Sequence, residues 1–181
     1  MKLRKLCIED APLMLEWMHM EDIAGAFRTD FRVMTLRDCE RFILESHGAG
    51  HVHYAVSGCM DEYLGTVSLK HIQNKTAEFA IVLRKKAMGS GCAAEAMQEI
   101  FRIGFSDMDL QNIYWYVSPH NQRAVRFYDK NGCQRADRCQ MEKLLCESIR
   151  TDVTEYRQYL WYMEEKHSWH FKIKGSRTNE E

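Results

Sequence analysis

Hydrophobic residues recur with two different periods along the chain, and the changes of period predict the order of its elements. Loose alternation over Lys2–Ile8 predicts a short strand. Apolar residues at helical spacing over Leu13–Met18 predict a helix, and Asp10 stands at its N-cap position. Thr35, with Asp38 three residues later, is a second helix-start signal. The first part of the chain is therefore expected to form one strand and two helices.

The middle of the chain changes to the period of a strand. Three runs rich in β-branched and aromatic residues lie at His51–Ser57, Tyr63–Leu69 and Thr76–Leu83. Short clusters of turn-forming residues separate these runs, including Gln73-Asn74-Lys75 before the third one. Because short turns join antiparallel neighbours, we expect an antiparallel meander here.

The helical period returns after this meander. A stripe of apolar residues from Ala93 to Phe105 predicts a long helix. Ile113–Val117 is typical of a strand, and Asn121–Lys130 of a helix that ends at Asn131-Gly132. For Gln134–Met163 we expect two further strands, although helix-like spacing near its end leaves a helix open. The whole pattern predicts an α/β (α+β) fold, with a mixed, mostly antiparallel twisted sheet of about six to seven strands and about four helices.

Length, charge and cysteine usage narrow the class of protein. The chain has 181 residues, the size of one domain, which we expect to cover residues 1–165 and to be followed by a polar tail over 166–181. A net charge of −1 lacks the basic surplus that nucleic-acid binders need, so no nucleic-acid partner is expected. Apolar runs are too short for a membrane span, so no membrane partner is expected either. The 7 cysteines are irregularly spaced, which favours reduced thiols and a cytoplasmic protein.

The segment from Arg84 to Cys92 carries the clearest sign of chemistry. It joins a strand to a long helix, is basic, and contains Gly89 and Gly91. Glycine permits positive φ and close approach of a ligand, and a helix N-terminus offers free N–H groups to phosphate. Lys86 adds positive charge. A plain strand-to-helix turn is the alternative, and the spacing fits neither the P-loop nor the dinucleotide-binding fingerprint.

Two blocks of residues resemble one known family. Lys86-Ala87-Met88-Gly89-Ser90-Gly91 is similar to the acyl-CoA pyrophosphate loop of the GNAT acetyltransferases, Q/R-x-x-G-x-G/A, with Lys in place of Gln or Arg. Asn121 to Cys133 resembles the family block N-x-x-A-x-x-x-Y-x-K-x-G-F, with Cys in place of the final Phe. The segment from Leu15 to Ile43 looks like the ribosomal-protein-alanine acetyltransferase branch, which also contains enzymes that act on amino sugars and polyamines.

The resemblance implies the GNAT fold, acetyl-CoA as cosubstrate, no metal, and direct transfer to an amine in a ternary complex. Backbone groups from Ile81 to Leu83 would pair with the pantetheine arm as an added strand does. Amides from Met88 to Ala93 would hold the pyrophosphate, and Asn121 would hydrogen-bond the cosubstrate. The implied cofactor-binding residues are Ile81, Val82, Leu83, Lys86, Met88, Gly89, Ser90, Gly91, Cys92, Ala93 and Asn121.

Two side chains are candidates for the catalytic groups. Glu78 lies on an otherwise apolar strand, where burial would make its carboxylate a stronger proton acceptor, acting directly or through a water. A solvent-facing or ion-paired glutamate is the alternative. The resemblance matches Tyr128 to the family tyrosine that positions or reprotonates the CoA sulfur, although a core aromatic would look the same. The backbone amide near Val82 is the natural donor to the thioester oxyanion.

The amine acceptor is the least readable part of the sequence. Phe27, Arg28 and Phe31 share a loop in which an arginine could bind a diphosphate and an aromatic ring a base. A small-molecule amine, such as a nucleotide-linked amino sugar, is therefore our first expectation. The alternatives are a protein α-amine, recognised by acidic groups such as Asp30, and a non-catalytic acyl-CoA-binding module. The apolar segment Tyr156–Met163 predicts a surface for a homodimer.

Overall fold

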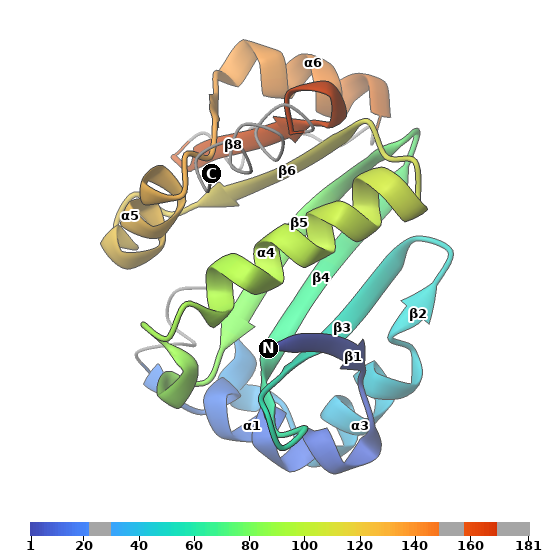
Figure 1. Ribbon diagram of the computed structural model, residues 1–181, viewed down its shortest axis with the longest axis vertical. Helices are drawn as coiled ribbons and strands as arrows, with labels where there is room; N and C mark the ends of the chain where they lie inside the picture. Colours follow the sequence, from blue (N-terminus) through green and yellow to red (C-terminus); the bar gives the residue numbers. More distant parts are fainter. Residues whose placement is uncertain (22–29, 149–157, 170–181) are drawn as a thin grey trace, which may run out of the picture. The chain divides into compact units, whose positions relative to one another are not determined.

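The computed structural model describes residues 1–21, 30–148 and 158–169 of the chain. Its strands form one eight-stranded sheet in the order β1-β3-β4-β5-β6-β8-β7, with β2 paired to β3 (Figure 1). Pairing is parallel between β5 and β6 and antiparallel for β1–β3, β2–β3, β3–β4, β6–β8 and β7–β8. The strands are β1 (Lys2–Lys5), β2 (His47–Gly48), β3 (His51–Ser57), β4 (Tyr63–Gln73), β5 (Thr76–Leu83), β6 (Asn112–Val117), β7 (Arg135–Ala136) and β8 (Leu160–Glu165).

The described residues also form helices. None of these helices is long and apolar enough to cross a membrane. The predicted α/β (α+β) class and the mostly antiparallel sheet are confirmed. The additional strand is β2, which is only 2 residues long and therefore too short to show a period. The helices are α1 (Ala11–Met18), α3 (Leu36–Leu44), α4 (Cys92–Arg102), α5 (Gln122–Lys130) and α6 (Arg138–Ser148), with short helical turns η1 (Ile8–Asp10), η2 (Phe31–Val33), η3 (Lys85–Ala87) and η4 (Ile103–Asp107).

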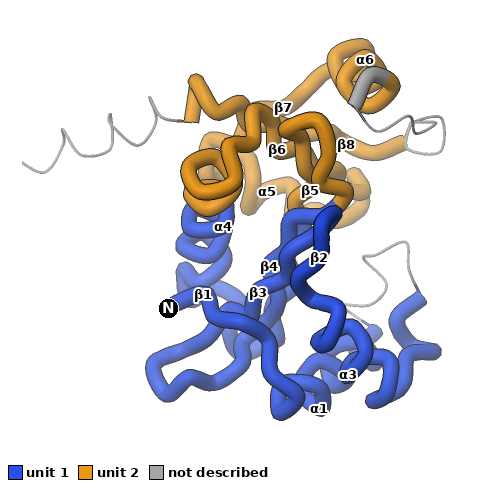
Figure 2. Tube along the Cα trace, turned by 90° about the vertical axis from the view of Figure 1, so that its right-hand side faces the viewer, with its two compact units in different colours: residues 1–70, 80–100 blue, residues 71–79, 101–181 orange. Residues whose placement is uncertain are grey.

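Two compact units divide the chain, and their boundaries fall within β4, β5 and α4 (Figure 2). Unit 1 comprises Met1–Lys70 and Ala80–Ile100, and therefore holds the glycine loop that follows β5. Unit 2 comprises His71–Phe79 and Phe101–Glu181, and therefore holds both candidate catalytic side chains. The residues predicted for cofactor binding and for catalysis thus lie mostly in different units.

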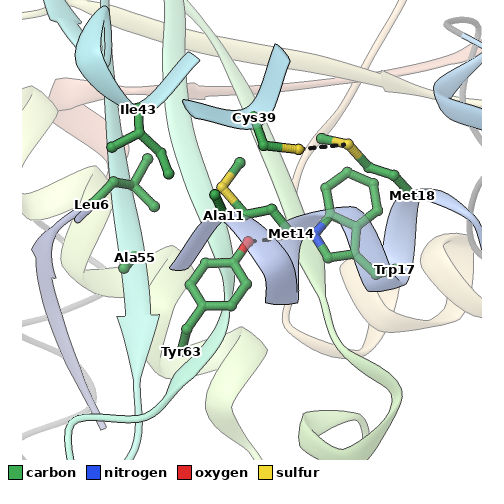
Figure 3. Close-up of a cluster of buried hydrophobic side chains, with 9 residues drawn as sticks. All are labelled: Leu6, Ala11, Met14, Trp17, Met18, Cys39, Ile43, Ala55 and Tyr63. Carbon is green, nitrogen blue, oxygen red and sulfur yellow. Dashed lines mark hydrogen bonds between the residues drawn. The ribbon is translucent and has the colours of Figure 1, made fainter. Parts of the chain in front are cut away.

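The core of unit 1 joins the first helices to strands of the sheet (Figure 3). Trp17 of α1 donates its Nε1–H to Tyr63 Oη at 3.3 Å, which ties the helix to β4. Cys39 of α3 donates its thiol to Met18 Sδ at 3.7 Å, which ties the two helices together. Both polar contacts satisfy groups that burial would otherwise leave without partners. The buried cluster consists of Leu6, Ala11, Met14, Trp17, Met18, Cys39, Ile43, Ala55 and Tyr63.

The two predicted helix starts use their acidic residues differently. At α3 the capping box is confirmed: Thr35 Oγ1 accepts from the Asp38 N–H, and the Asp38 carboxylate accepts from the Thr35 N–H. Asp10 does precede α1, but its side chain makes no bond to the helix amides. It accepts two hydrogen bonds from Arg4, each at 2.7 Å, and one from the Cys7 N–H at 3.0 Å. A charged bidentate donor holds a buried carboxylate more strongly than a neutral amide does.

In unit 2, α5 and α6 cover opposite faces of the strands β6 and β8 (Figure 2). Tyr114 and Trp161 belong to a buried cluster that includes side chains of α6. Trp115 and Tyr162, which alternate with them along the strands, lie beside Tyr128 of α5 with ring centroids 5.2 and 5.3 Å away. The face covered by α5 is therefore an aromatic core, and this core surrounds one of the predicted catalytic residues.

The C-terminal part of the chain adds a helix to one prediction and corrects another. The two strands expected in Gln134–Met163 are present as β7 and β8. The helix α6 lies between them in the chain and is amphipathic, because Met141 and Leu145, four residues apart, are both buried. The dimer surface predicted at Tyr156–Met163 is wrong for its last three residues. These are buried within the chain because β8 pairs with β6 on one side and β7 on the other. Residues 156–157 lie outside the described residues.

The beginning of the predicted tail packs on unit 2. Lys166–Trp169 are helical, and Trp169 is buried with its ring centroid 5.3 Å from that of Phe105. Residues 170–181 lie outside the described residues. The limits 1–165 for the domain stay a prediction.

Candidate active site

The loop between β5 and α4 has the backbone form that a phosphate-binding loop needs. Gly89 and Gly91 have φ of 82° and 88°, in the left-handed region that favours glycine. A Cβ atom placed on either glycine would meet no atom within 4 Å, so this side of the loop is open. Ser90 lies between them and donates its hydroxyl to the Ala87 carbonyl at 2.7 Å. The chain's own hydrogen bonds therefore fix the loop.

Backbone N–H groups of this loop divide into engaged and open donors. The Met88 N–H, predicted to hold pyrophosphate, donates instead to the Lys85 carbonyl at 3.1 Å, because the chain closes the η3 turn there. The Cys92 N–H lies 3.4 Å from Ser90 Oγ, a long hydrogen bond. Open donors at the start of a helix suit an anionic pyrophosphate, so the loop fits the predicted ligand. Those that meet no acceptor within the described part of the chain belong to Gly89, Ser90, Gly91 and Ala93.

The basic residues before the loop are paired with carboxylates. Arg84 is 8% exposed and donates Nη2–H to Glu16 Oε2 at 2.7 Å and Nη1–H to the Tyr63 carbonyl at 3.2 Å. Lys86 donates Nζ–H to Glu62 Oε1. The positive charge expected beside the glycines is therefore balanced by acidic residues. The Lys86 pair is half-exposed and costs little to open, so this lysine stays available to a phosphate, whereas the buried guanidinium of Arg84 does not.

The second half of β5 runs beyond its ladder with β6. The two strands pair at three positions, and the last of these joins Glu78 to Tyr114. Ile81–Leu83 follow, and the first two of these residues are only half-buried. Gly65 of β4 lies so close that a Cβ on it would be 2.2 Å from the carbonyl oxygen of Val82. This stretch of β5 backbone fits the predicted pairing with a pantetheine arm because no β6 pair is recorded for it in the described residues.

Glu78 is buried and hydrogen-bonded to a residue that the sequence reasoning missed. Its Oε2 lies 3.0 Å from His71 Nδ1 at the end of β4. The side chain of Glu78 is 8% exposed, and that of His71 is 59% exposed. The prediction ended this strand at Leu69, which placed His71 in a loop. The turn at Asn74-Lys75 is the signal that would have found His71. His71 lies three residues before this turn and Glu78 three residues after it, so a hairpin with this turn places the two residues opposite each other.

The ring of Tyr128 is enclosed by other aromatic rings of unit 2. The ring centroids of Phe127, Trp115, Tyr162 and Phe79 lie 5.1, 5.2, 5.3 and 6.4 Å from it. Burial raises the pKa of Tyr128 above its ordinary value, so the phenol keeps its proton at neutral pH. Among the described residues its hydroxyl has no hydrogen-bond partner. A protonated hydroxyl that the chain does not engage suits a proton donor.

The two candidate catalytic side chains lie on opposite faces of β5. Phe79 packs toward Tyr128, and Glu78, its neighbour in the strand, points to the other face toward His71. The structure therefore places Glu78 and Tyr128 in one unit but gives them separate surroundings. Each must be explained by its own neighbours.

The remaining predicted residues have structural partners or lie outside the described ranges. Asn121 caps α5, because its Oδ1 accepts from the Ala124 N–H at 3.1 Å, and its side-chain NH2 group can still donate to a ligand. Phe31 is half-buried, with its ring edge-on to Trp17 at a centroid distance of 5.2 Å. Residues 27–28, which are Phe and Arg, lie outside the described residues, so this part of the predicted substrate loop is not described.

Metal-ligating side chains do not gather in the ranges 1–21, 30–148 and 158–169: no group of three or more His, Cys, Asp or Glu is placed to hold an ion. The rings of His51 and His53 lie 5.0 Å apart, but His53 Nδ1 is hydrogen-bonded to Ser68 Oγ at 2.7 Å. All 7 cysteines are free thiols.

Known proteins share both the sequence pattern and the fold. The chain is 21% identical over 123 residues to the acetyltransferase PseH of Campylobacter jejuni, covering 68% of this chain and 76% of that protein. It is 32% identical over 76 residues to the spermidine N(1)-acetyltransferase of Escherichia coli K12, covering 41% of each. The crystal structure of spermidine N-acetyltransferase from Vibrio cholerae with CoA and spermine has the same fold, with a TM-score of 0.75 at 17% identity over 93% of this chain and 96% of that one.

The family model for the acetyltransferase (GNAT) domain matches residues 1–134. This match spans β1 to the end of α5 and includes both blocks that carry the resemblance in the sequence. The chain therefore belongs to the GNAT family and is an acetyl-CoA-dependent N-acetyltransferase.

Proposed function

We propose that the enzyme acetylates the primary amine of a small molecule by direct attack on acetyl-CoA in a ternary complex. The observation that carries this proposal is the surroundings of Glu78. This buried carboxylate lies 3.0 Å from an exposed imidazole, and such a pair can take a proton from an ammonium group and release it to solvent. An amine must lose this proton before its nitrogen can attack.

Each candidate residue then has one task in the transfer. The open amides of the loop over residues 89–93 bind the pyrophosphate, and the backbone of Ile81–Leu83 holds the pantetheine arm. Acetyl-CoA supplies an activated acetyl group as its thioester. The acid–base centre at Glu78 takes the proton of the ammonium, the amine forms the C–N bond, and the Val82 amide stabilises the oxyanion. The C–S bond then breaks, and the Tyr128 phenol gives its proton to the departing thiolate.

A nucleotide-linked amino sugar is the first candidate for the acceptor. Phe31 packs against Trp17, and Arg32 next to it is exposed and bound to exposed Asp30, with Nε 2.7 Å from Oδ1. Because ion pairs at exposed positions contribute little, a diphosphate could replace the carboxylate on this guanidinium and gain a bidentate contact. The aromatic and arginine residues of this loop support the nucleotide-linked class, and the similarity to the acetyltransferase PseH over 68% of the chain supports acetyl transfer.

A polyamine is the second candidate, and the acidic residues of the same loop favour it. The hydrogen bond and charge of Asp30 raise the pKa of Arg32, and the charge of Glu21 adds to this effect. A cationic polyamine would replace Arg32 as the partner of these carboxylates. The similarity to spermidine acetyltransferases supports this class over a shorter part of the chain. A protein α-amine, as in the ribosomal-protein-alanine branch, ranks third, and membership of that branch and the homodimer stay predictions.

The experiment is an acceptor panel that measures thiol release from acetyl-CoA. The panel contains a nucleoside-diphosphate amino sugar, the same sugar without the nucleotide, spermidine, spermine and a basic N-terminal peptide. We expect the highest kcat/KM for the nucleotide-linked sugar. Arg32→Ala should raise KM for that acceptor about tenfold, which is the loss expected for one charged contact, and leave KM for the free sugar unchanged.

The matched variant Asp30→Asn separates the candidates. It should leave the nucleotide-linked sugar active, or improve its KM, because the competing carboxylate is gone. If spermidine is the preferred acceptor and Asp30→Asn raises its KM, the polyamine replaces the amino sugar. If no amine on the panel is acetylated while CoA still binds, the transferase proposal fails, and a non-catalytic acyl-CoA-binding module takes its place.

A further inference from the structure

His71 forms a side-chain pair that the family resemblance did not indicate. Its Nδ1 lies 3.0 Å from Glu78 Oε2, and both residues belong to unit 2. The carboxylate is 8% exposed, whereas the imidazole is 59% exposed. One ring nitrogen therefore faces a buried carboxylate, and the rest of the ring is accessible to solvent. This asymmetry decides which of the two groups an amine in solution can reach.

The backbone of His71 is held in an uncommon conformation. Its φ is 51°, in the left-handed region, which residues with a Cβ atom rarely adopt. Asn74 and Lys75 also have positive φ, but they form the turn that joins β4 to β5, where such values are ordinary. His71 lies three residues before this turn and Glu78 three residues after it. Backbone strain outside a turn often marks a functional position, and here it is found at the residue that contacts the buried acid.

We propose that His71 is the residue that accepts the proton of the amine, and that Glu78 is a positioning residue that holds its ring. This inference rests on the proposed acetyl transfer. The Glu78 carboxylate accepts a hydrogen bond from Nδ1–H, which leaves the Nε2 lone pair open. The ammonium transfers one proton to Nε2, the ring becomes an imidazolium paired with the carboxylate, and the free amine attacks. Nε2–H then returns its proton to water, and the pair is restored.

The contacts of the pair favour this order over direct proton transfer to Glu78. Oε2 of Glu78 is already engaged by the ring, and its side chain is closed to solvent. A carboxylate that holds Nδ1–H fixes the tautomer and stabilises the imidazolium, which is how buried acids assist histidine bases in other enzymes. Lys75, in the turn of this hairpin, pairs with Asp109 at 2.6 Å. Tyr114 stands opposite Glu78 on β6.

The kinetic test is His71→Asn with the best acceptor from the panel. Asparagine tolerates a left-handed φ, and its amide can donate to Glu78 from nearly the position of Nδ1, but it has no base at the position of Nε2. We expect kcat to fall about 10²-fold and the KM for acetyl-CoA to stay within about twofold. The acidic limb of the kcat/KM profile should also disappear. The matched control is His167→Asn, which removes another exposed histidine of unit 2 and should leave kcat unchanged. Wild-type kcat and an unchanged pH profile in His71→Asn would overturn the proposal.

A second measurement tests the pair without an acceptor. The ¹⁵N chemical shifts of the imidazole distinguish the two neutral tautomers, and we expect His71 to carry its proton on Nδ1 in the wild-type protein. In Glu78→Gln this preference should be lost, while the melting temperature stays close to that of the wild type. A proton on Nε2 in the wild-type protein would refute the pair. If the tautomer is as expected but no amine is acetylated, the transferase proposal fails and the pairing of the two side chains survives.

Discussion

His53 is a buried imidazole whose titration should control the acid stability of unit 1. It is 7% exposed, its Nδ1 is hydrogen-bonded to Ser68 Oγ at 2.7 Å, and its ring centroid lies 4.4 Å from that of Phe42. Burial lowers the pKa of His53 from its ordinary 6.5 to about 4, and nearby positive charge, including that of His51, adds to the effect. The folded protein therefore keeps this ring neutral in a pH range in which the unfolded chain protonates it.

The size of the effect follows from these two pKa values. Below pH 6.5 the unfolded chain binds a proton that the folded chain binds only near pH 4, so the free energy of unfolding falls as the pH falls through that window. For these two pKa values, the loss between about pH 7.5 and pH 5 is about 2 kcal/mol. Water at the ring edge would screen the charge and reduce the loss toward about 1 kcal/mol. At neutral pH the contribution of the neutral ring is fully present.

The assay is urea unfolding at several pH values, followed by tryptophan fluorescence. The double variant His53→Met with Ser68→Ala removes the ring and the hydroxyl that it would leave unpaired. Compared with the wild type, it should lose about 1 to 2 kcal/mol less stability between pH 7.5 and pH 5. Ser68→Ala alone keeps the ring and should keep the pH dependence. If the double variant loses as much stability on acidification as the wild type does, the buried imidazole is not the group responsible.

Three further substitutions test the site residues. Gly65→Ala should destabilise the protein by about 3 kcal/mol or more in urea unfolding, since its Cβ would lie 2.2 Å from the Val82 carbonyl oxygen. Gly58→Ala would place its Cβ 3.4 Å from the Leu64 side chain and should cost less than about 1 kcal/mol, and equal losses would contradict this reasoning. Gly89→Val should weaken CoA binding in calorimetry at least tenfold, because a β-branched residue disfavours φ of 82°; a normal Kd would refute the pyrophosphate assignment. Tyr128→Phe should lower kcat about 10²-fold and leave acetyl-CoA affinity unchanged; an unchanged kcat would rule out the proton-donor role.

Signals that act within a few residues of chain were read correctly from the sequence. The capping box of Thr35 and Asp38 begins α3 where expected, and Asn131 ends α5. The strands β3 and β5 have the predicted limits. In each case the residues that decide the structure lie within one turn or one strand of one another. Period and capping chemistry are local, so a single sequence contains them.

Partners that lie on another element of the fold were not predictable in this way. Arg84 was expected to add charge to the phosphate loop, but Glu16, 68 residues away, binds its guanidinium at 2.7 Å. Asp10 was expected to cap α1, but Arg4 of β1 holds its carboxylate. A short polar side chain satisfies whichever donor the fold brings nearest, and only the tertiary structure decides which one that is. Burial then makes the choice costly to reverse.

In the candidate site, strand β5 depends both on a local sequence pattern and on packing against other elements. The sequence singled out Glu78 because a carboxylate interrupts an apolar run, and burial of this residue is confirmed. Alternation along the strand sends Glu78 toward His71 and Phe79 toward Tyr128, so neighbouring residues point to opposite faces of the sheet. A register shift of one residue would exchange these surroundings, placing a carboxylate among aromatic rings and a phenylalanine beside an exposed imidazole. The aromatic core around Tyr128 therefore also fixes which face the acid occupies, and in this way packing on one side of β5 orients the acid–base pair on the other.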